Sequence, residues 1–150
     1  SINTARQGCL CPAIALARAL LKHLLLKKGQ VVIVDSEAGA EVFGRGLAED
    51  FNYTLCISDP TFRSLLISRD LLRMAEELEV KNRVLIINKV VDLERTERLA
   101  EELVPEIPKY YVSYDENVPI YELKGLSVDK YPLNSPLVRD LRFIFKSLFR

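Results

Sequence analysis

The chain has 150 residues, of which 49% are hydrophobic and 28% charged, a composition that excludes a disordered protein and suffices for one domain with a core. Lys and Arg together number 21, as do Asp and Glu, so the net charge of zero favours neither nucleic acid nor an anionic membrane as a partner. No apolar run is long enough for a membrane span, and the amino end lacks a signal pattern, so we expect a cytoplasmic protein.

The residue patterns predict helices and strands in alternation. Pro12 and the apolar stripe of residues 13–28 predict a helix that Gly29 ends. The β-branched run Val31–Val34 predicts a strand buried on both faces. Three more strands are predicted at Tyr53–Ile57, Arg83–Ile87 and Tyr110–Val112, and helical stripes cover residues 65–78, 93–103 and 136–149.

This alternation predicts an α/β fold, in which residues 1–150 form a single domain around a parallel sheet with right-handed crossovers and helices on both faces. Ligands of such sheets bind beyond the carboxyl ends of the strands. We therefore expect the loops that begin at Asp35, Ser58 and Asn88 to lie at one edge and to contain the functional residues.

An acidic loop follows the first predicted strand, with Asp35, Glu37, Gly39 and Glu41 in close succession. A carboxylate at a strand end can hold a magnesium ion or its water, and a glycine lets the backbone approach a terminal phosphate. Asp35 and Gly39 are therefore candidate catalytic residues of a nucleotide switch. The alternative is that Asp35 only caps the next segment.

The predicted strand that ends at Ile87 is followed by Asn88 and Lys89, which are candidate base-binding residues. An Asn amide offers a donor and an acceptor to a purine edge, and a Lys stem can lie along the ring. Proteins that bind GTP use Asn-Lys-x-Asp, but here Asp92 comes one residue late, which favours adenine. The alternative is a simple turn after a strand.

Cys9 and Cys11 are separated by one residue, and thiolates at this spacing favour a soft or borderline metal. A closed zinc site needs four ligands, so two chains related by a two-fold axis would supply them. The pair therefore predicts a metal-bridged dimer. Two ordinary cysteines before a helix, or a redox pair, are the alternatives. Cys56 is predicted to be a buried apolar residue inside a strand.

Smaller features complete the predictions. Asp59 is expected to start the long helix that follows it, and Pro119 to mark a loop. The segment 113–116 offers a cradle for a base, although a solvated turn explains it better. The basic and aromatic tail, residues 136–150, suggests surface binding only mildly, and a packed closing helix accounts for it better.

Several motifs together carry a family resemblance. They are, in order, Gly8-Cys9-Leu10-Cys11-Pro12, Val34-Asp35-Ser36-Glu37-Ala38-Gly39, Glu41 with Gly44-Arg45-Gly46, Asp59-Pro60 and Asn88-Lys89-Val90. With these motifs the chain resembles the carboxyl-terminal part of the CooC-type ATPases, nickel-insertion accessory proteins of carbon monoxide dehydrogenase. That family belongs to the MinD-like division of P-loop NTPases.

The resemblance implies an ATP-dependent metallochaperone with a partial doubly wound, P-loop NTPase-like sheet. It implies ATP and ADP binding with magnesium, a nucleotide-driven homodimer, and carbon monoxide dehydrogenase as client. Cys9 and Cys11 would bind nickel or zinc, Asp35 would be the switch aspartate, Gly39 would face the terminal phosphate and Asn88 would contact adenine.

The chain departs from the family pattern in two places: it has no Gly-rich phosphate loop, and Val42 stands where the family often has His. We therefore expect no ATP hydrolysis by the chain alone. We also expect an open sheet edge that promotes self-association. Two other functions stay open, a non-catalytic metal-binding dimerisation module and a MinD-like regulatory ATPase.

Overall fold

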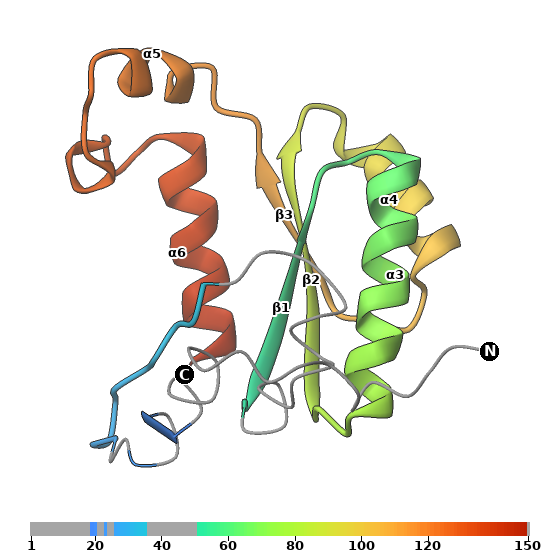
Figure 1. Ribbon diagram of the computed structural model, residues 1–150. Coiled ribbons are helices and arrows are strands. Elements are labelled where there is room, and N and C mark those ends of the chain that lie inside the picture. Colours follow the sequence, from blue (N-terminus) through green and yellow to red (C-terminus); the bar gives the residue numbers. More distant parts are fainter. Residues whose placement is uncertain (1–18, 21–22, 24–25, 36–50, 150) are drawn as a thin grey trace. The chain divides into compact units, whose positions relative to one another are not determined.

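The structure is a computed structural model that describes residues 19–20, 23, 26–35 and 51–149 (Figure 1). Helices and strands alternate in it, which confirms the predicted α/β class. The elements are, in chain order, β1 (Tyr53–Ser58), α3 (Phe62–Glu77), β2 (Asn82–Val90), α4 (Leu93–Leu103), β3 (Lys109–Ser113), α5 (Val118–Leu123), the 3₁₀ helix η2 (Val128–Lys130) and α6 (Pro136–Leu148).

Contacts within the chain define two compact units. Unit 1 comprises Ser1–Thr54 and Asp70–Arg83, and unit 2 comprises Leu55–Arg69 and Val84–Arg150.

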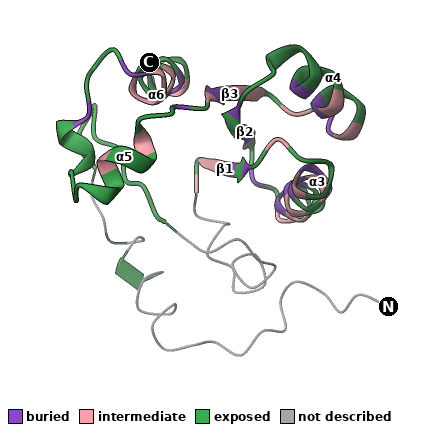
Figure 2. Ribbon diagram, turned by 90° about the horizontal axis from the view of Figure 1, so that it is seen from above, coloured by how far each residue is buried: buried purple, intermediate pink, exposed green. Residues whose placement is uncertain are grey.

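The sheet has the strand order β1-β2-β3, and its strands run parallel, as predicted (Figure 1). Strands that follow one another in the chain are also neighbours in the sheet. Because the right-handed crossovers run in the same direction along the sheet, the helices after β1 and β2 lie on the same face. In unit 2, α4 and the first half of α3 cover one face of the sheet, and α6 covers the other (Figure 2). This arrangement places the carboxyl ends of the three strands at one edge.

The core of unit 2 follows from the central position of β2. Residues 84–87 are buried without a break, as expected of a strand that is covered on both faces. The largest fully buried side chains are Leu65 from α3, Leu85 and Ile87 from β2, and Val112 from β3. Cys56 in β1 is also buried, which confirms its predicted place in the interior.

Unit 1 contains a smaller apolar cluster at the carboxyl end of α3. Ala75 and Val80 are buried, and four partly buried residues pack against them, namely Phe51, Leu71, Met74 and Leu78. The N–H of Val80 donates to the carbonyl of Ala75 at 3.0 Å across Glu79, whose φ is 59°. This is the Schellman pattern of a helix end, with a glutamate in the left-handed position that glycine usually takes.

The prediction of a buried strand at Val31–Val34 is wrong. These four residues lie outside any strand, and even the least exposed of them, Val34, is 38% exposed. A strand needs a neighbouring backbone to pair its N–H and C=O groups, and a run of β-branched residues does not supply one. The sheet of the described residues consists of β1, β2 and β3.

The helix predicted for residues 13–28 is described in part. Ala19, Leu20 and His23 are helical, but Leu26 and Lys27 are not, so the helix ends earlier than predicted. A turn follows, in which Gly29 has a φ of 85°. The predicted break at this glycine is thus a turn just after the helix, with the N–H of Gln30 donating to Lys27 O at 3.0 Å.

The other predicted elements are present, with ends that shift by up to three residues. Two local predictions are wrong. Pro119 lies in the first turn of α5 rather than in a loop, because that position needs no N–H donor. Thr61 rather than Asp59 caps α3, since its hydroxyl oxygen accepts the N–H of Ser64 at 3.2 Å.

Candidate functional site

The carboxyl edge of the sheet in unit 2 brings together the ends of β1 and β2, as the sequence predicted for Ser58 and Asn88. Lys89 Nζ lies 3.3 Å from Asp59 Oδ1, so an ion pair joins the end of β2 to the loop after β1. Both side chains are largely exposed, at 61% and 51%. The pair is therefore weak and accessible to a ligand.

Asn88 and Lys89 lie in a β-bulge, not in a loop beyond the strand. Ile87 pairs with Tyr111, and the next pair is Val90 with Ser113, so β2 contains one more residue than β3 over this interval. Lys89 has a φ of 58°, a conformation that a residue with a Cβ rarely adopts. Bulges of this kind redirect side chains and occur often beside binding sites.

The bulge also fixes the amide of Asn88. Its Oδ1 accepts the backbone N–H of Lys89 at 2.9 Å, which orients the side chain. The amide nitrogen remains able to donate to an acceptor on a ligand. Half-buried Asn88 and exposed Lys89 thus present a donor and an aliphatic stem from adjacent positions.

Asp92 has a structural role at the same edge. Its Oδ1 accepts the N–H of Arg95 at 3.1 Å, and its Oδ2 lies 3.2 Å from Arg95 Nε. Its backbone oxygen accepts the hydroxyl of Thr96 at 2.6 Å. Asp92 is therefore the N-cap of α4, and its carboxylate is engaged in holding that helix.

The segment after β3 differs from the predicted solvated turn at Asp115, which is buried. Its carboxylate accepts the backbone N–H of Asn117 at 3.0 Å and that of Leu137, in the first turn of α6, at 3.5 Å. Burial raises the pKa of Asp115, but hydrogen bonds from the backbones of Asn117 and Leu137 and the side chains of Asn117 and Ser135 outweigh it, so the pKa lies below its ordinary value. Because its carboxylate holds α6, Asp115 is not a base cradle.

The remaining candidates lie outside the described residues or in the other unit. Cys9, Cys11 and Gly39 lie outside the described residues. Asp35 is exposed and belongs to unit 1, whereas Asn88 and Lys89 belong to unit 2. Within residues 19–20, 23, 26–35 and 51–149, no group of three His, Cys, Asp or Glu side chains is arranged to hold a metal ion.

Cys56 is not a reactive thiol. Burial raises its pKa, and a hydrogen bond with the side chain of Ser68 opposes this only in part. A nucleophilic or metal-binding cysteine needs the opposite shift, toward the thiolate.

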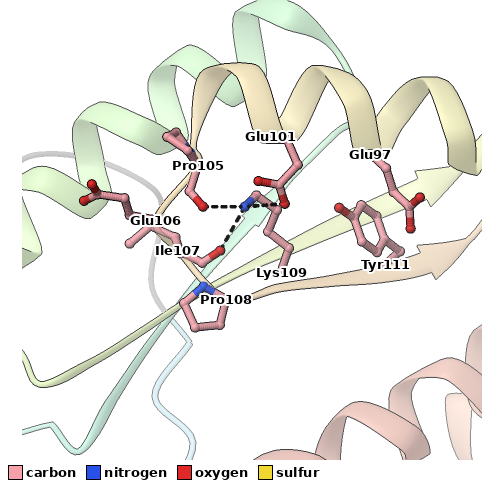
Figure 3. A pocket seen from close by; sticks show the side chains of 8 residues that line it. All are labelled: Glu97, Glu101, Pro105, Glu106, Ile107, Pro108, Lys109 and Tyr111. Carbon is pink, nitrogen blue, oxygen red and sulfur yellow. Dashed lines mark hydrogen bonds and ion pairs between the residues drawn. The ribbon is translucent and has the colours of Figure 1, made fainter.

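A cavity of about 530 Å³ lies between α4 and β3, and sequence reasoning did not predict it (Figure 3). Lys109, the first residue of β3, extends into it with only 6% of its side chain exposed. Its Nζ donates to Pro105 O at 3.2 Å and Ile107 O at 3.1 Å and pairs with Glu101 at 3.0 Å. All three donors of the ammonium are thus used, and this lysine joins the end of α4 to the start of β3.

Tyr111 lines the same cavity opposite the glutamates of α4 (Figure 3). Burial raises its pKa, and the charges of Glu97 and Glu101 raise it further, so its hydroxyl stays protonated. Tyr111 is therefore not an activated phenolate in this cavity. The only signal in the sequence was a lysine just after Pro105 and Pro108, a pattern too common to indicate a buried ammonium.

None of the described helices is both long and apolar enough to cross a bilayer. No family model matches the chain. Among curated proteins, the chain is 35% identical to the uncharacterized ATP-binding protein MJ0823 of Methanocaldococcus jannaschii over its whole length. Over 93% of its own length, the present chain is 34% identical to the carbon monoxide dehydrogenase accessory protein CooC of Rhodospirillum rubrum.

A shorter match, 45% identical over 86 residues, relates 57% of the chain to the uncharacterized ATP-binding protein MJ0084 of M. jannaschii. The chain spans 58% of MJ0823 and 52% of CooC, so it covers between half and two thirds of those two relatives. The match to MJ0823 covers the whole chain and therefore every described element of the sheet and its helices. The chain therefore belongs to the family that contains CooC and these uncharacterized ATP-binding proteins.

Proposed function

We propose that this chain is part of an ATP-binding accessory protein for carbon monoxide dehydrogenase. The observation that carries the proposal is the 34% identity to CooC over 93% of the chain. The names of MJ0823 and MJ0084 add ATP binding as a shared property of the relatives.

The geometry of the carboxyl edge supports a place for the adenine base. The Asn88 amide, held by its bond to the Lys89 N–H, donates to a ring nitrogen of the base, and the Lys89 stem lies along the ring. A base that binds here would displace the ion pair between Lys89 and Asp59. Because that pair is exposed and weak, its loss costs the protein little stability. Since Asp92 is engaged as the cap of α4, the edge favours adenine over guanine.

The phosphate and metal chemistry is proposed for residues outside this edge. Asp35 would act near magnesium and Gly39 would face the terminal phosphate. Cys9 and Cys11 of two protomers would bind one nickel or zinc ion, and the homodimer would release it to the client as it rearranges with nucleotide. Four thiolates would complete the tetrahedral set of a closed zinc site. Thiolates also suit other borderline metals such as nickel.

Base recognition is tested by photolabelling the full chain with 8-azido-ATP in the presence of magnesium, a method that detects weak binding. We expect labelling that ATP and ADP suppress more strongly than GTP does. Asn88→Ala should weaken the labelling about fivefold, which corresponds to the free energy of about one hydrogen bond. Asn82→Ala, at the other end of β2, is the matched control and should label normally. Equal suppression by GTP, or equal labelling of both variants, would overturn the adenine assignment.

Metal binding is tested by native mass spectrometry of the anaerobically purified chain, with nickel or zinc added. We expect one metal per dimer, and its loss in Cys9→Ser/Cys11→Ser. If the double variant retains the metal, or if the wild-type chain stays metal-free, the shared thiolate site is wrong, whatever the photolabelling shows.

A further inference from the structure

A second concave surface lies in unit 2, and none of the residues proposed to bind the base lines it. It is independent of the proposed function. It is a cavity of about 480 Å³ between α6 and the segment that contains η2. Its apolar walls are Val128 and Leu133 on one side and Leu141 and Phe145 on the other, with Arg142 and Lys146 at its rim. We refer to these six residues as the α6 groove.

The groove is a built feature of the fold. On the opposite side of α6, buried Ile144 faces inward and the ring of Phe143 meets Tyr110 of β3 with centroids 6.4 Å apart. The 128–133 segment is held by Tyr131, which is buried and packs on Tyr121 of α5 at 4.6 Å. Figure 1 shows α5 and the segment after it leading into α6. Tyr131 itself lines the groove, so one wall is held by a lining residue that packs on α5, and the other by contacts of α6 with β3.

Although both walls are held in place, their apolar side chains are exposed to solvent. Val128, Leu133, Leu141 and Phe145 are all exposed, the least of them, Leu141, at 43%. On α6, Val138, Leu141 and Phe145 follow one another at intervals of three and four residues, which makes a continuous stripe. An apolar groove between a helix and a neighbouring segment is the shape that receives a partner helix.

The charges at the rim indicate which helix it receives. In the described part of the chain, no carboxylate pairs with Arg142 or Lys146. Asp129 also lines the groove, but its carboxylate pairs with Lys130 at 3.3 Å, and Arg139 pairs with Asp140 at 3.0 Å. Two positive charges therefore remain beside the apolar walls. A partner helix with carboxylates beside its apolar stripe satisfies both.

Other occupants fit less well. A second copy placed across a two-fold axis would bring two pairs of cations together. An anionic bilayer is recognised by clusters of about four to eight basic residues, whereas the rim of this groove has two. We infer that the α6 groove binds an acidic amphipathic helix of a partner protein.

The test uses the full chain and a fluorescein-labelled helical peptide with leucines at spacings of three and four and glutamates beside them. A peptide with lysines in place of the glutamates is the comparison. Fluorescence anisotropy should show binding of the acidic peptide at least about tenfold tighter than that of the basic one. Arg142→Glu/Lys146→Glu should reverse this preference, and Leu141→Ser should weaken both peptides.

Lys124→Glu, an exposed charge reversal outside the groove, is the matched control and should bind like the wild type. Circular dichroism checks that each variant folds. The inference is overturned if the wild type binds neither peptide or binds both equally. It is also overturned if the double variant keeps the wild-type preference. Tighter binding to vesicles with 30% phosphatidylglycerol, or a dimer that Leu141→Ser dissociates, would assign the groove to a membrane or to a second copy instead.

Discussion

Two lysines at opposite ends of the sheet show how the fold separates structural from accessible charge. Lys109 at the start of β3 is 6% exposed and uses its three donors on Pro105, Ile107 and Glu101. Lys89 at the end of β2 is 61% exposed, has one ion-pair partner at 3.3 Å and sits at a φ of 58°. A buried and fully bonded ammonium stabilises a fold, whereas an exposed one in an unfavourable conformation is available to a ligand.

The carboxylates near the carboxyl edge divide in the same way. Asp92 and Asp115 each bind the amino end of a helix, while the Asp59 carboxylate makes an exposed contact with Lys89. Residues that hold helices are thus interleaved in sequence with residues that are free to meet a ligand. Substitutions on either side of this division should therefore differ in their effect on stability.

Lys109→Met should destabilise the chain by about 2 kcal/mol, because two carbonyls and Glu101 lose a charged donor in a nearly buried place. Urea unfolding followed by circular dichroism gives the change in midpoint. Lys109→Arg, which keeps the charge, should recover part of the lost stability. If Lys109→Met is as stable as the wild type, the distinction between the two lysines fails.

Asp115→Asn should destabilise the chain at neutral pH by about 1 kcal/mol, since charge-assisted hydrogen bonds to the amino end of α6 are lost. The pKa of Asp115 in the folded chain is depressed, so its contribution is present above its ordinary value of 3.8 and disappears as the pH falls through the folded pKa. The difference between variant and wild type should therefore shrink between pH 7 and pH 3. A difference that stays constant over this range would show that the carboxylate charge is not involved.

Asp92→Ala should destabilise α4 by about 1 kcal/mol through loss of its N-cap, and Asp92→Asn, which also caps helices, should restore most of this. Neither variant should change the ratio of ATP to GTP in competition for the azido-ATP label. A shift in that ratio would place Asp92 in the base site and remove it from the structural group.

Lys89→Met should change the free energy of unfolding by less than about 0.5 kcal/mol, because exposed ion pairs contribute little. Lys89→Gly should be neutral or slightly stabilising, as glycine adopts the left-handed conformation without strain. Both are measured by the same urea series. A loss comparable with that of Lys109→Met would show that Lys89 is structural after all.

The sequence predicted the strand and helix regions after residue 52 well, because buried strands and amphipathic helices are encoded in local patterns. The run of residues 84–87 and the helical stripe of residues 93–103 are examples. The same logic failed at Val31–Val34, since a pattern states that a segment can be a strand but not that a neighbour is available to pair with it.

The candidate edge was predicted in part. Asn88 and Lys89 were identified from residue type, and their position at the carboxyl edge followed from the parallel sheet. The bulge was not foreseen, because it arises from the pairing of β2 with β3, two strands separated by a helix. Thr61 as the cap of α3, in place of Asp59, also needed the backbone geometry.

By itself, the sequence determined the α/β class, the order of the elements and the residue types available for nucleotide and metal chemistry, since local periodicity and short motifs encode these. Only the tertiary structure decided which charges are engaged. Asp115 was expected to be solvated but is buried under the start of α6. No sequence pattern marked Lys109, whose ammonium uses all three of its donors. These outcomes depend on which distant backbone groups come within hydrogen-bonding distance, and that is set by the packing of helices on the sheet rather than by any residue's neighbours in the chain.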